Sequence, residues 1–312
     1  MSHHVRIQMA TYNGADFLAE QLASFLAQKH DDWSLTVSDD GSTDGTRDIL
    51  ERFQARNRDR EIQILDGPGR GSAANFLSIL HRDKVPKGAY VALSDQDDIW
   101  MAHRLKRALA VMNTGGDATA QIYASRTALI DKDLSWRKLS KRHRFDPAFG
   151  NALVQNVLAG NTIVMNPAAA QIAAETAQTA LRFVPPFHDW WLYLLLSGVG
   201  ADMINDLRPG VLYRQHAGNV IGAHRGTGRA LRRLGMIADK RYARWIDRNI
   251  TALSRCGALL TSDNQETLDR FHTWRRQGGR YASLQSLKET GVWRQTGAGN
   301  AILVLMARSG WF

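Results

Sequence analysis

The sequence predicts an α/β fold in which a mostly parallel sheet is flanked by helices and followed by a C-terminal helical appendage. Three observations support this prediction. Strand-like and helix-like patterns alternate over the first ~125 residues, which is typical of a parallel sheet covered on both faces. A polar stretch follows each of these strands. Beyond residue 225 the sequence becomes helical, Arg-rich and Trp-containing, which indicates a second region.

Four strands are predicted in the first part of the chain, each a short apolar run with polar or glycine-rich flanks, at 5–11, 33–39, 61–65 and 89–95. The segments between them carry apolar residues at helical spacing, which predicts helices over 15–29, 47–53 and 73–80. Another helix is expected to begin at "IWMAHRL", directly after Asp98. Further β-like segments follow at 121–130, 161–165 and 210–216.

The composition indicates an ordinary globular protein that remains in the cytoplasm. The chain has one cysteine, Cys256, which excludes a disulfide framework and a thiolate metal cluster and favours a reducing compartment. The N-terminal residues lack the apolar segment of a secretory signal, and the longest apolar runs are shorter than the ~20 residues that span a bilayer. We therefore expect a protein that is soluble or peripheral on the inner face of the cell membrane.

The segment "LSDQDDIW" (93–100) places Asp95, Asp97 and Asp98 at the end of a predicted buried strand. Buried carboxylates must be paired, protonated or bound to a metal. In an extended chain Asp95 and Asp97 face the same way, whereas Asp98 points elsewhere. Such oxygen ligands suit Mg²⁺ or Mn²⁺. The alternative is that Asp97 or Asp98 caps the helix that follows.

Polar residues also follow the other predicted strands. Asp39 and Asp40 can accept hydrogen bonds from a base N–H or a ribose hydroxyl, while Tyr12 offers a stacking face and Asn13 a polar contact. Because the carboxyl ends of parallel strands meet at one edge of a sheet, we expect these stretches to converge there. Neither G-x-x-x-x-G-K-[ST] nor G-x-G-x-x-G follows the first strand, so P-loop and dinucleotide sites are not indicated.

The net charge of +10 comes entirely from the C-terminal part, where residues 221–312 hold 16 Lys and Arg against 6 Asp and Glu. This excess indicates an anionic partner or a solvated helical face. Basic residues alternate with apolar ones in a predicted amphipathic helix that can lie on an anionic membrane: Arg232, Arg233, Arg241, Arg244, Trp245 and Arg248. The alternative is a helical cap on the catalytic domain or on a second subunit of a homo-oligomer. No nucleic-acid-binding pattern is present, so no nucleic-acid partner is expected.

Six segments, in order along residues 4–225, resemble the family-two glycosyltransferases of GT-A fold, and most of all their bacterial rhamnosyltransferase-like members. They are "MATYNGADFLAEQLASFLAQ", "VSDDGSTDGTRDIL", "YVALSDQDDIW", "GNTIVMN", "HDWWLYLLL" and "YRQHAGNVIG". The resemblance implies a Rossmann-like GT-A catalytic domain over 1–225. It leaves 226–312 as a basic helical region with a membrane-surface, oligomerisation or capping role.

The resemblance also implies roles for single residues. The nucleotide sugar would be held by Ala10, Thr11, Tyr12 and Asn13 around the base, Asp40 with Asp39 on the base, Arg70 and Asn75 near the nucleotide, and Asp95 on the ribose. Asp97 would ligate Mg²⁺ or Mn²⁺ between the two phosphates. His216 would be a further metal ligand or diphosphate contact, or else a structural histidine, and Asp98 a second metal contact or the helix cap.

Asp189 is the predicted catalytic base that deprotonates the acceptor hydroxyl. The family often has Glu-Asp at this position, and this chain has His188 instead of the glutamate. A carboxylate beside apolar rings is desolvated, which raises its pKa toward useful values; the alternative is a helix cap, and both can hold. Trp190 or Trp191 would stack on a sugar, although one of them is expected in the core. Gly160 would allow close approach in a strand, 159–165, under the donor sugar.

The expected function is the inverting, metal-dependent transfer of a sugar from a nucleotide-sugar donor, with dTDP-rhamnose as the candidate. The acceptor would be a glycan or a lipid-linked glycan in surface polysaccharide biosynthesis. Two alternatives stay open: a non-catalytic nucleotide-sugar or glycan-binding protein of the same fold, and a metal-dependent nucleotidyltransferase or phosphoesterase.

Overall fold

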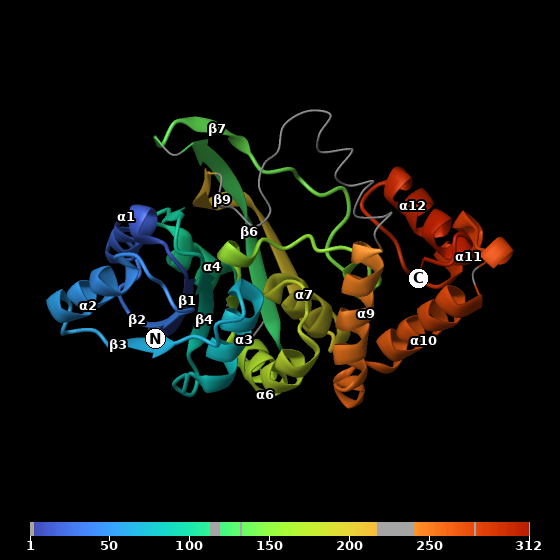
Figure 1. Cartoon of the computed structure of the whole chain (residues 1–312), viewed down its shortest axis with the longest axis horizontal. Coiled ribbons are helices and arrows are strands. Elements are labelled where there is room, and N and C mark those ends of the chain that lie inside the picture. Colours follow the sequence, from blue (N-terminus) through green and yellow to red (C-terminus); the bar gives the residue numbers. More distant parts are fainter. Residues whose placement is uncertain (1–2, 113–118, 132, 217–239, 278, 312) are drawn as a thin grey trace.

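The computed structural model describes residues 3–112, 119–131, 133–216, 240–277 and 279–311. A twisted central sheet carries helices on both faces, and a group of helices follows at the C-terminal end (Figure 1). Arg232 and Arg233 of the predicted amphipathic helix lie outside the described residues. Among the described helices, none combines the length and the apolar character that a membrane span requires.

The first half of the sheet is parallel, as predicted. Its strands are β1 (Val5–Thr11), β2 (Trp33–Asp39), β3 (Ile62–Asp66) and β4 (Tyr90–Ser94), in the order β3-β2-β1-β4. The connecting helices are α1 (Ala15–Leu26), α2 (Thr46–Arg56) and α3 (Ser72–Arg82). These elements match the predicted ones to within a few residues, because local periodicity and flanking polar residues define them. The carboxyl ends of the four strands consequently lie at one edge.

The second half of the sheet is mixed. β6 (Gln121–Asp131) pairs antiparallel with β8 (Val164–Met165) and with β7 (Trp136–Leu139), and parallel with β9 (Asp202–Gln215). β8 also pairs antiparallel with β4 and so joins the two halves. The predicted strand over 161–165 is therefore shorter than expected, because a 3₁₀ turn, η1 (Gly160–Thr162), precedes β8.

The helix predicted to begin at residue 99 starts five residues later. Ile99–Trp100 form β5, which pairs antiparallel with β9, and α4 spans Arg104–Met112. Trp100 is buried, its N–H donates to Ser24 Oγ at 3.0 Å, and it lies opposite Val211. β5 thus pairs with a strand more than 100 residues away in the sequence instead of beginning a helix. No local sequence pattern reveals this pairing.

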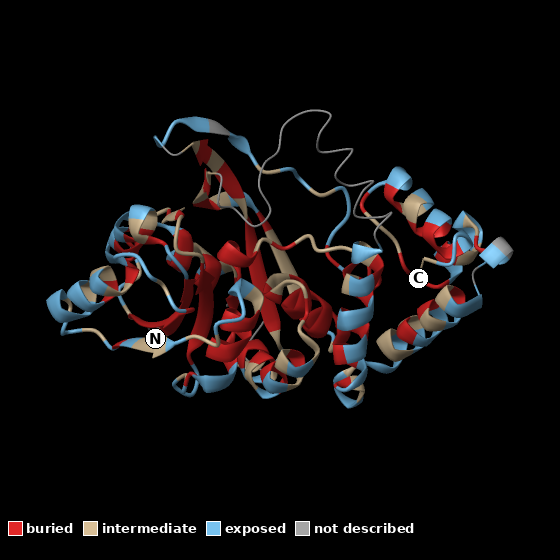
Figure 2. Ribbon diagram, in the orientation of Figure 1, coloured by how far each residue is buried: buried red, intermediate tan, exposed pale blue. Residues whose placement is uncertain are grey.

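Three further helices pack on one another, α6 and α7 also contact α3, and α6 contacts the sheet: α5 (Phe149–Ala152), α6 (Pro167–Phe183) and α7 (His188–Gly198). α7 is buried over almost its whole length (Figure 2), since every residue from Trp190 to Gly198 is buried. A helix that is apolar on all sides belongs inside a core. α7 is thereby enclosed by α3, α5, α6 and α9.

The C-terminal region consists of α9 (Arg241–Ser254), η2 (Gly257–Leu259), α10 (Ser262–Gln277), η3 (Gly279–Tyr281), α11 (Leu284–Glu289) and α12 (Gly297–Arg308). The apolar face of α9, including Ile246 and Ile250, is buried in the same core as α6 and α7. Trp245 packs on Phe187, with ring centroids 5.1 Å apart.

This packing corrects the membrane prediction for the α9 part of the tail. The apolar face that a bilayer would have received is used inside the molecule, and the exposed residues are polar or charged, among them Arg244, Asp247 and Arg248. α9 packs against α6 and α7, as the alternative of a helical cap requires.

Gly150 of α5 is predicted to be essential where α5 packs against the segment between α11 and α12. A Cβ at Gly150 would lie 2.0 Å from the carbonyl oxygen of Gly291, a backbone atom that cannot turn away. Gly150→Ala is therefore expected to destabilise the protein by about 1–3 kcal/mol, measured by urea unfolding. Gly297→Ala is the matched control, because a Cβ there meets nothing within 4 Å. Equal unfolding midpoints for the two variants would contradict this account of the interface.

Candidate active site

The polar stretches after the parallel strands converge as predicted. Thr11 Oγ1 donates to Asp39 Oδ1 at 2.9 Å, which joins the ends of β1 and β2. Gln96 joins the first loop to the carboxylate segment: its Oε1 accepts from Tyr12 N at 2.8 Å and its Nε2 donates to Tyr12 O at 2.9 Å. Tyr12 itself is 57 % exposed and offers a free ring face at this edge.

Asp39 and Asp40 organise the loops around them. Asp40 accepts hydrogen bonds from Gly69 N and Gly71 N, each at 2.7 Å, and both glycines have the positive φ that such a loop requires. Asp39 accepts from Ser42 N at 3.0 Å. Each acidic side chain therefore fixes a loop that would surround a nucleotide, and contact of either with a base stays a prediction.

The remaining residues predicted around the nucleotide differ in accessibility. Arg70 is exposed in the glycine loop, whereas Asn75 is buried beneath it and donates to Ser38 O at 2.8 Å. Ala10 and Thr11 are buried, and Asn13 accepts from Thr43 N at 2.8 Å. Asn75 is thus placed to support the loop from below.

Asp95, Asp97 and Asp98 come together at the same edge. One oxygen from each carboxylate lies within 4.8 Å of one from each of the other two. The prediction that Asp98 points elsewhere is wrong, because the chain bends between β4 and β5 instead of remaining extended. The helix-cap alternative for Asp97 and Asp98 is also wrong, since α4 begins only at Arg104.

Two distant segments hold this carboxylate cluster. Asp98 is fully buried and accepts from Asn161 Nδ2 and, at 3.2 Å, from Arg214 N. His216 Nε2 lies 2.7 Å from Asp97 Oδ2. Arg214 also donates through Nε to Asp97 O at 3.0 Å. The end of β9 therefore brings His216 to Asp97, as the predicted metal-site role for both requires.

The electrostatics of the carboxylate cluster favour a bound cation. Burial, together with repulsion from Asp97 and Asp189, raises the pKa of Asp95 to about 8. Burial, together with repulsion from Asp97 and Asp95, raises the pKa of Asp98 well above its usual range. Without a cation, the buried Asp95 and Asp98 resist ionisation, whereas a divalent cation would neutralise their charge. An all-carboxylate set with one histidine fits Mg²⁺ or Mn²⁺.

Asp189 lies in the first turn of α7, beside this cluster. Its Oδ1 accepts from Trp190 N at 2.7 Å and its Oδ2 from Gly160 N at 3.3 Å. Burial raises the pKa of Asp189 to about 6, although the backbone hydrogen bonds and Asn156 oppose the rise. The residue preceding the helix is Phe187, so Asp189 is not its cap. η1 connects the two halves of the site, because Gly160 contacts Asp189 and Asn161 contacts Asp98.

Gly160 allows the start of α7 to approach this turn. A Cβ there would lie 2.7 Å from His188 Nε2 and 3.1 Å from Asp189 Cβ. The expectation of a strand at this position is wrong, since the residue belongs to the 3₁₀ turn.

His188 is buried and stacks on Phe76 with ring centroids 3.8 Å apart, and burial lowers its pKa to about 3. The imidazole is therefore neutral at physiological pH.

The prediction that Trp190 stacks on a sugar is wrong. Trp190 is 3 % exposed, and its Nε1 donates to Ala152 O at 2.7 Å. Trp191 is fully buried as well, so both rings belong to the core and not one of them as expected. Their physical role is to fix α7, and with it Asp189.

Three functional candidates escaped the sequence analysis. Asn161 and Arg214 lie inside the segments "GNTIVMN" and "YRQH" that carry the family resemblance, so their position in these segments could have indicated them. Arg104 is buried behind the cluster, where its positive charge lowers the pKa of Asp95, and its guanidinium lies 3.4 Å from the Trp100 ring. Nothing in the sequence around Arg104 marks it.

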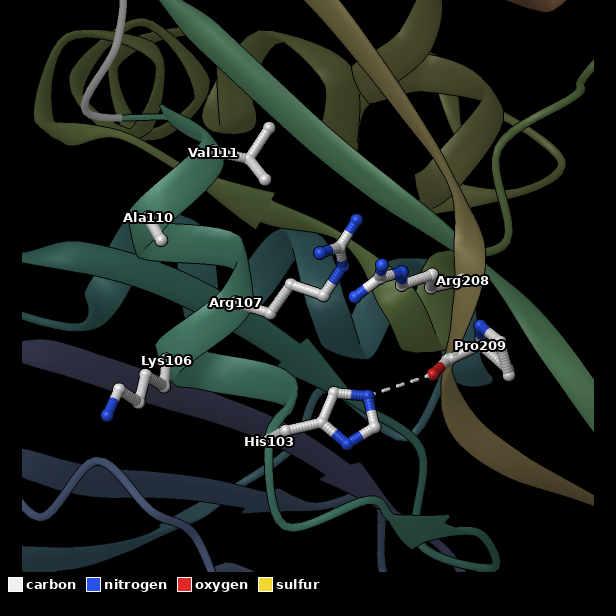
Figure 3. A pocket seen from close by; sticks show the side chains of 7 residues that line it. All are labelled: His103, Lys106, Arg107, Ala110, Val111, Arg208 and Pro209. Atoms are coloured by element: carbon white, nitrogen blue, oxygen red, sulfur yellow. Dashed lines mark hydrogen bonds between the residues drawn. The ribbon is translucent and has the colours of Figure 1, made fainter.

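A separate cavity of about 490 Å³ lies between α4 and β9 (Figure 3). Its lining is basic and includes His103, Lys106, Arg107 and Arg208. Arg107 is paired there with Asp206. No residue of the predicted site lines this cavity, so it does not belong to the candidate active site.

Sequence comparison gives a family match and a relative that covers most of the chain. The sequence profile of Glycosyl transferase family 2 matches residues 7–171. The dTDP-rhamnosyl transferase RfbG of Shigella flexneri is 31 % identical over 254 residues, covering 79 % of this chain and 84 % of that protein.

Two solved structures share the fold. S. aureus TarS 1–349 in complex with UDP-GlcNAc has a TM-score of 0.52 at 13 % identity, covering 98 % of this chain and 88 % of that one. The mannosyltransferase PcManGT from Pyrobaculum calidifontis, in complex with GDP-Man and Mn²⁺, has a TM-score of 0.50 at 16 % identity, covering 98 % and 87 %. At these identities the likeness shows the fold alone, and it confirms the predicted GT-A architecture.

Proposed function

Because the chain belongs to glycosyl transferase family 2, we propose that it is an inverting, metal-dependent enzyme that transfers a sugar from a nucleotide-sugar donor. One observation supports this most: the short turn η1 holds Asp189 on one side and the carboxylate cluster on the other. A proton acceptor and a cation site are thereby fixed beside one another at the carboxyl edge of the sheet, where α/β proteins bind ligands.

The nucleotide would lie over the ends of β1 and β2. Tyr12 offers its exposed ring to the base, Ala10, Thr11 and Asn13 line the pocket, and Asp39 and Asp40 keep the loops in place. Arg70 extends from the glycine loop toward the phosphates, with Asn75 beneath it. In this proposal Asp95 contacts the ribose.

Asp97 and His216, with Asp95 or Asp98 nearby, would hold Mg²⁺ or Mn²⁺. When bound, the cation stabilises the negative charge of the departing nucleoside diphosphate. Asp189 accepts the proton of the acceptor hydroxyl, and the acceptor oxygen forms its bond to the anomeric carbon as the bond to the diphosphate breaks. A single displacement inverts the configuration, so product NMR that shows retention would refute this mechanism.

We propose rhamnose as the sugar and a glycan or lipid-linked glycan as the acceptor, supported by the likeness to a dTDP-rhamnosyl transferase. The test is a thermal-shift panel of nucleotide sugars with Mg²⁺ or Mn²⁺. A larger metal-dependent shift with dTDP-rhamnose than with UDP- or GDP-sugars is expected. No shift with any donor would overturn the proposal, and release of nucleoside monophosphate would favour a nucleotidyltransferase or phosphoesterase instead.

The pH dependence of turnover provides a direct test of the base. Asp189 must be ionised to accept a proton, and its pKa is raised to about 6. Turnover is therefore expected to be constant above that value and to fall about ten-fold for each pH unit below it. His188, with a pKa lowered to about 3, stays neutral and does not contribute to the fall in turnover below pH 6. A profile measured with saturating donor and metal that stays flat down to pH 4 would exclude Asp189 as the base.

A further inference from the structure

The β6–β7 hairpin projects from the body of the molecule near the end of β9 (Figure 1). The ladder pairs Ala128 with Leu139 and Ile130 with Trp136, and Ser140 N closes it with a bond of 2.8 Å to Thr127 O. The hairpin is therefore an ordered element. Its outer strand, β7, is exposed (Figure 2).

Apolar side chains gather on this exposed outer part. Trp136 is 64 % exposed, Leu134 at the turn 48 % and Leu139 37 %. Leu134 has a φ of +67°, a conformation that a leucine adopts only at a cost. Exposure of a tryptophan and a leucine to water is energetically unfavourable, so their position on a projecting turn indicates a contact with a partner.

The charge of the same segment specifies the kind of partner. Residues 131–145 contain six Lys and Arg against two Asp. Lys138, Lys141 and Arg142 are exposed, and within the described part of the chain none of the three forms an ion pair. Basic side chains that flank exposed Trp and Leu match an anionic lipid surface, where the cations meet phosphates and the indole lies at headgroup level.

The hairpin is also continuous with the candidate active site. Ile130 and Asp131 of β6 are in register with Arg214 and Gln215 of β9, and His216 follows directly. A surface into which Trp136 inserts would accordingly lie near Asp97 and His216, the residues proposed to hold the cation. If the proposed function holds, a lipid-linked acceptor in that surface would be within reach of Asp189.

We propose that the outer part of the β6–β7 hairpin, residues 133–142, docks on a membrane. Leu134 and Trp136 enter the headgroup region of an anionic bilayer, and Lys138, Lys141 and Arg142 bind lipid phosphates. This assigns to the hairpin the contact that α9 cannot make, because the apolar face of α9 is buried against the catalytic domain.

The test is co-sedimentation of the full chain with phosphatidylcholine vesicles that contain either no anionic lipid or about 30 % phosphatidylglycerol. Binding is expected only with the anionic lipid and is expected to weaken as salt rises. The triple variant K138Q/K141Q/R142Q should bind about 100-fold more weakly, and W136S about ten-fold more weakly. Melting temperatures establish that each variant is folded.

Matched controls remove the same charge and the same kind of side chain elsewhere. R244Q/R248Q/R276Q takes three exposed cations from α9 and α10, and Leu284→Ser removes a side chain that is 56 % exposed. Both should retain vesicle binding. The proposal is overturned if the control triple loses as much binding as the hairpin triple, or if wild-type binding does not depend on anionic lipid.

A glycan-binding role of the hairpin is a separate outcome. If W136S leaves vesicle binding unchanged but lowers transfer to a lipid-free oligosaccharide, Trp136 contacts the acceptor and the membrane proposal is wrong. Vesicle binding needs no donor, metal or turnover, so its failure would leave the proposed glycosyl transfer untouched.

Discussion

Asp189→Asn is expected to lower kcat about 1000-fold while leaving the KM for the donor within about two-fold of wild type. The amide cannot accept the proton of the acceptor hydroxyl. It has the same shape as the carboxylate, and its oxygen can still accept from Trp190 N within the first turn of α7, although its amide nitrogen cannot accept from Gly160 N. Steady-state kinetics with saturating metal and acceptor measures both constants.

The control for this variant is Asp263→Asn. Asp263 is an exposed acid in the first turn of α10, so its replacement reproduces the loss of a carboxylate at a helix start without touching the site. It should retain wild-type kcat. If Asp189→Asn keeps more than about a tenth of wild-type turnover, or if its loss appears only in KM, Asp189 is not the general base.

Asp97→Ala is expected to abolish metal-dependent transfer, with turnover at least about 1000-fold lower and Mn²⁺ binding weakened by about 100-fold or more. Asp97 contacts His216 and also repels Asp95. Its removal therefore deletes a proposed metal ligand and relieves repulsion at once. The melting temperature without metal should be unchanged or higher, which separates loss of the metal from loss of the fold.

Calorimetric titration of Mn²⁺ into the wild type and the variant checks this expectation. Asp59→Ala is the control, because Asp59 is an exposed carboxylate outside the site. Mn²⁺ binding and turnover close to wild type in Asp97→Ala would remove Asp97 from the metal site. A lower metal-free melting temperature would instead show that Asp97 stabilises the fold.

The parallel half of the sheet could be predicted from the sequence to within a few residues. β1 and β2 have the bounds that their apolar runs predict, 5–11 and 33–39. These strands are buried on both faces, so every residue in them follows the pattern. Because the strands are parallel, their carboxyl ends lie at the same edge of the sheet. The sequence therefore predicts that Asp40 and Asp95 lie on one side of the molecule.

The second half could not be predicted in this way, because its contacts are remote in sequence. Trp100 belongs to a strand only because β9 lies beside it, and Asp98 meets Arg214 across 116 positions. Trp190 was assigned to a sugar because it follows the predicted base. In the structure Ala152 and Tyr242 surround it, and neither is near in the sequence.

The sequence by itself determined the α/β class, the family and the identity of the acidic residues, because periodicity and short motifs are local properties. Only the tertiary structure decided that Asp98 joins Asp95 and Asp97, that η1 connects this cluster to Asp189, and that the apolar face of α9 is buried. It also left Trp136 exposed on a basic hairpin. The physical reason is the same in each case: burial and pKa depend on which distant segments pack together, and the chain order does not state this.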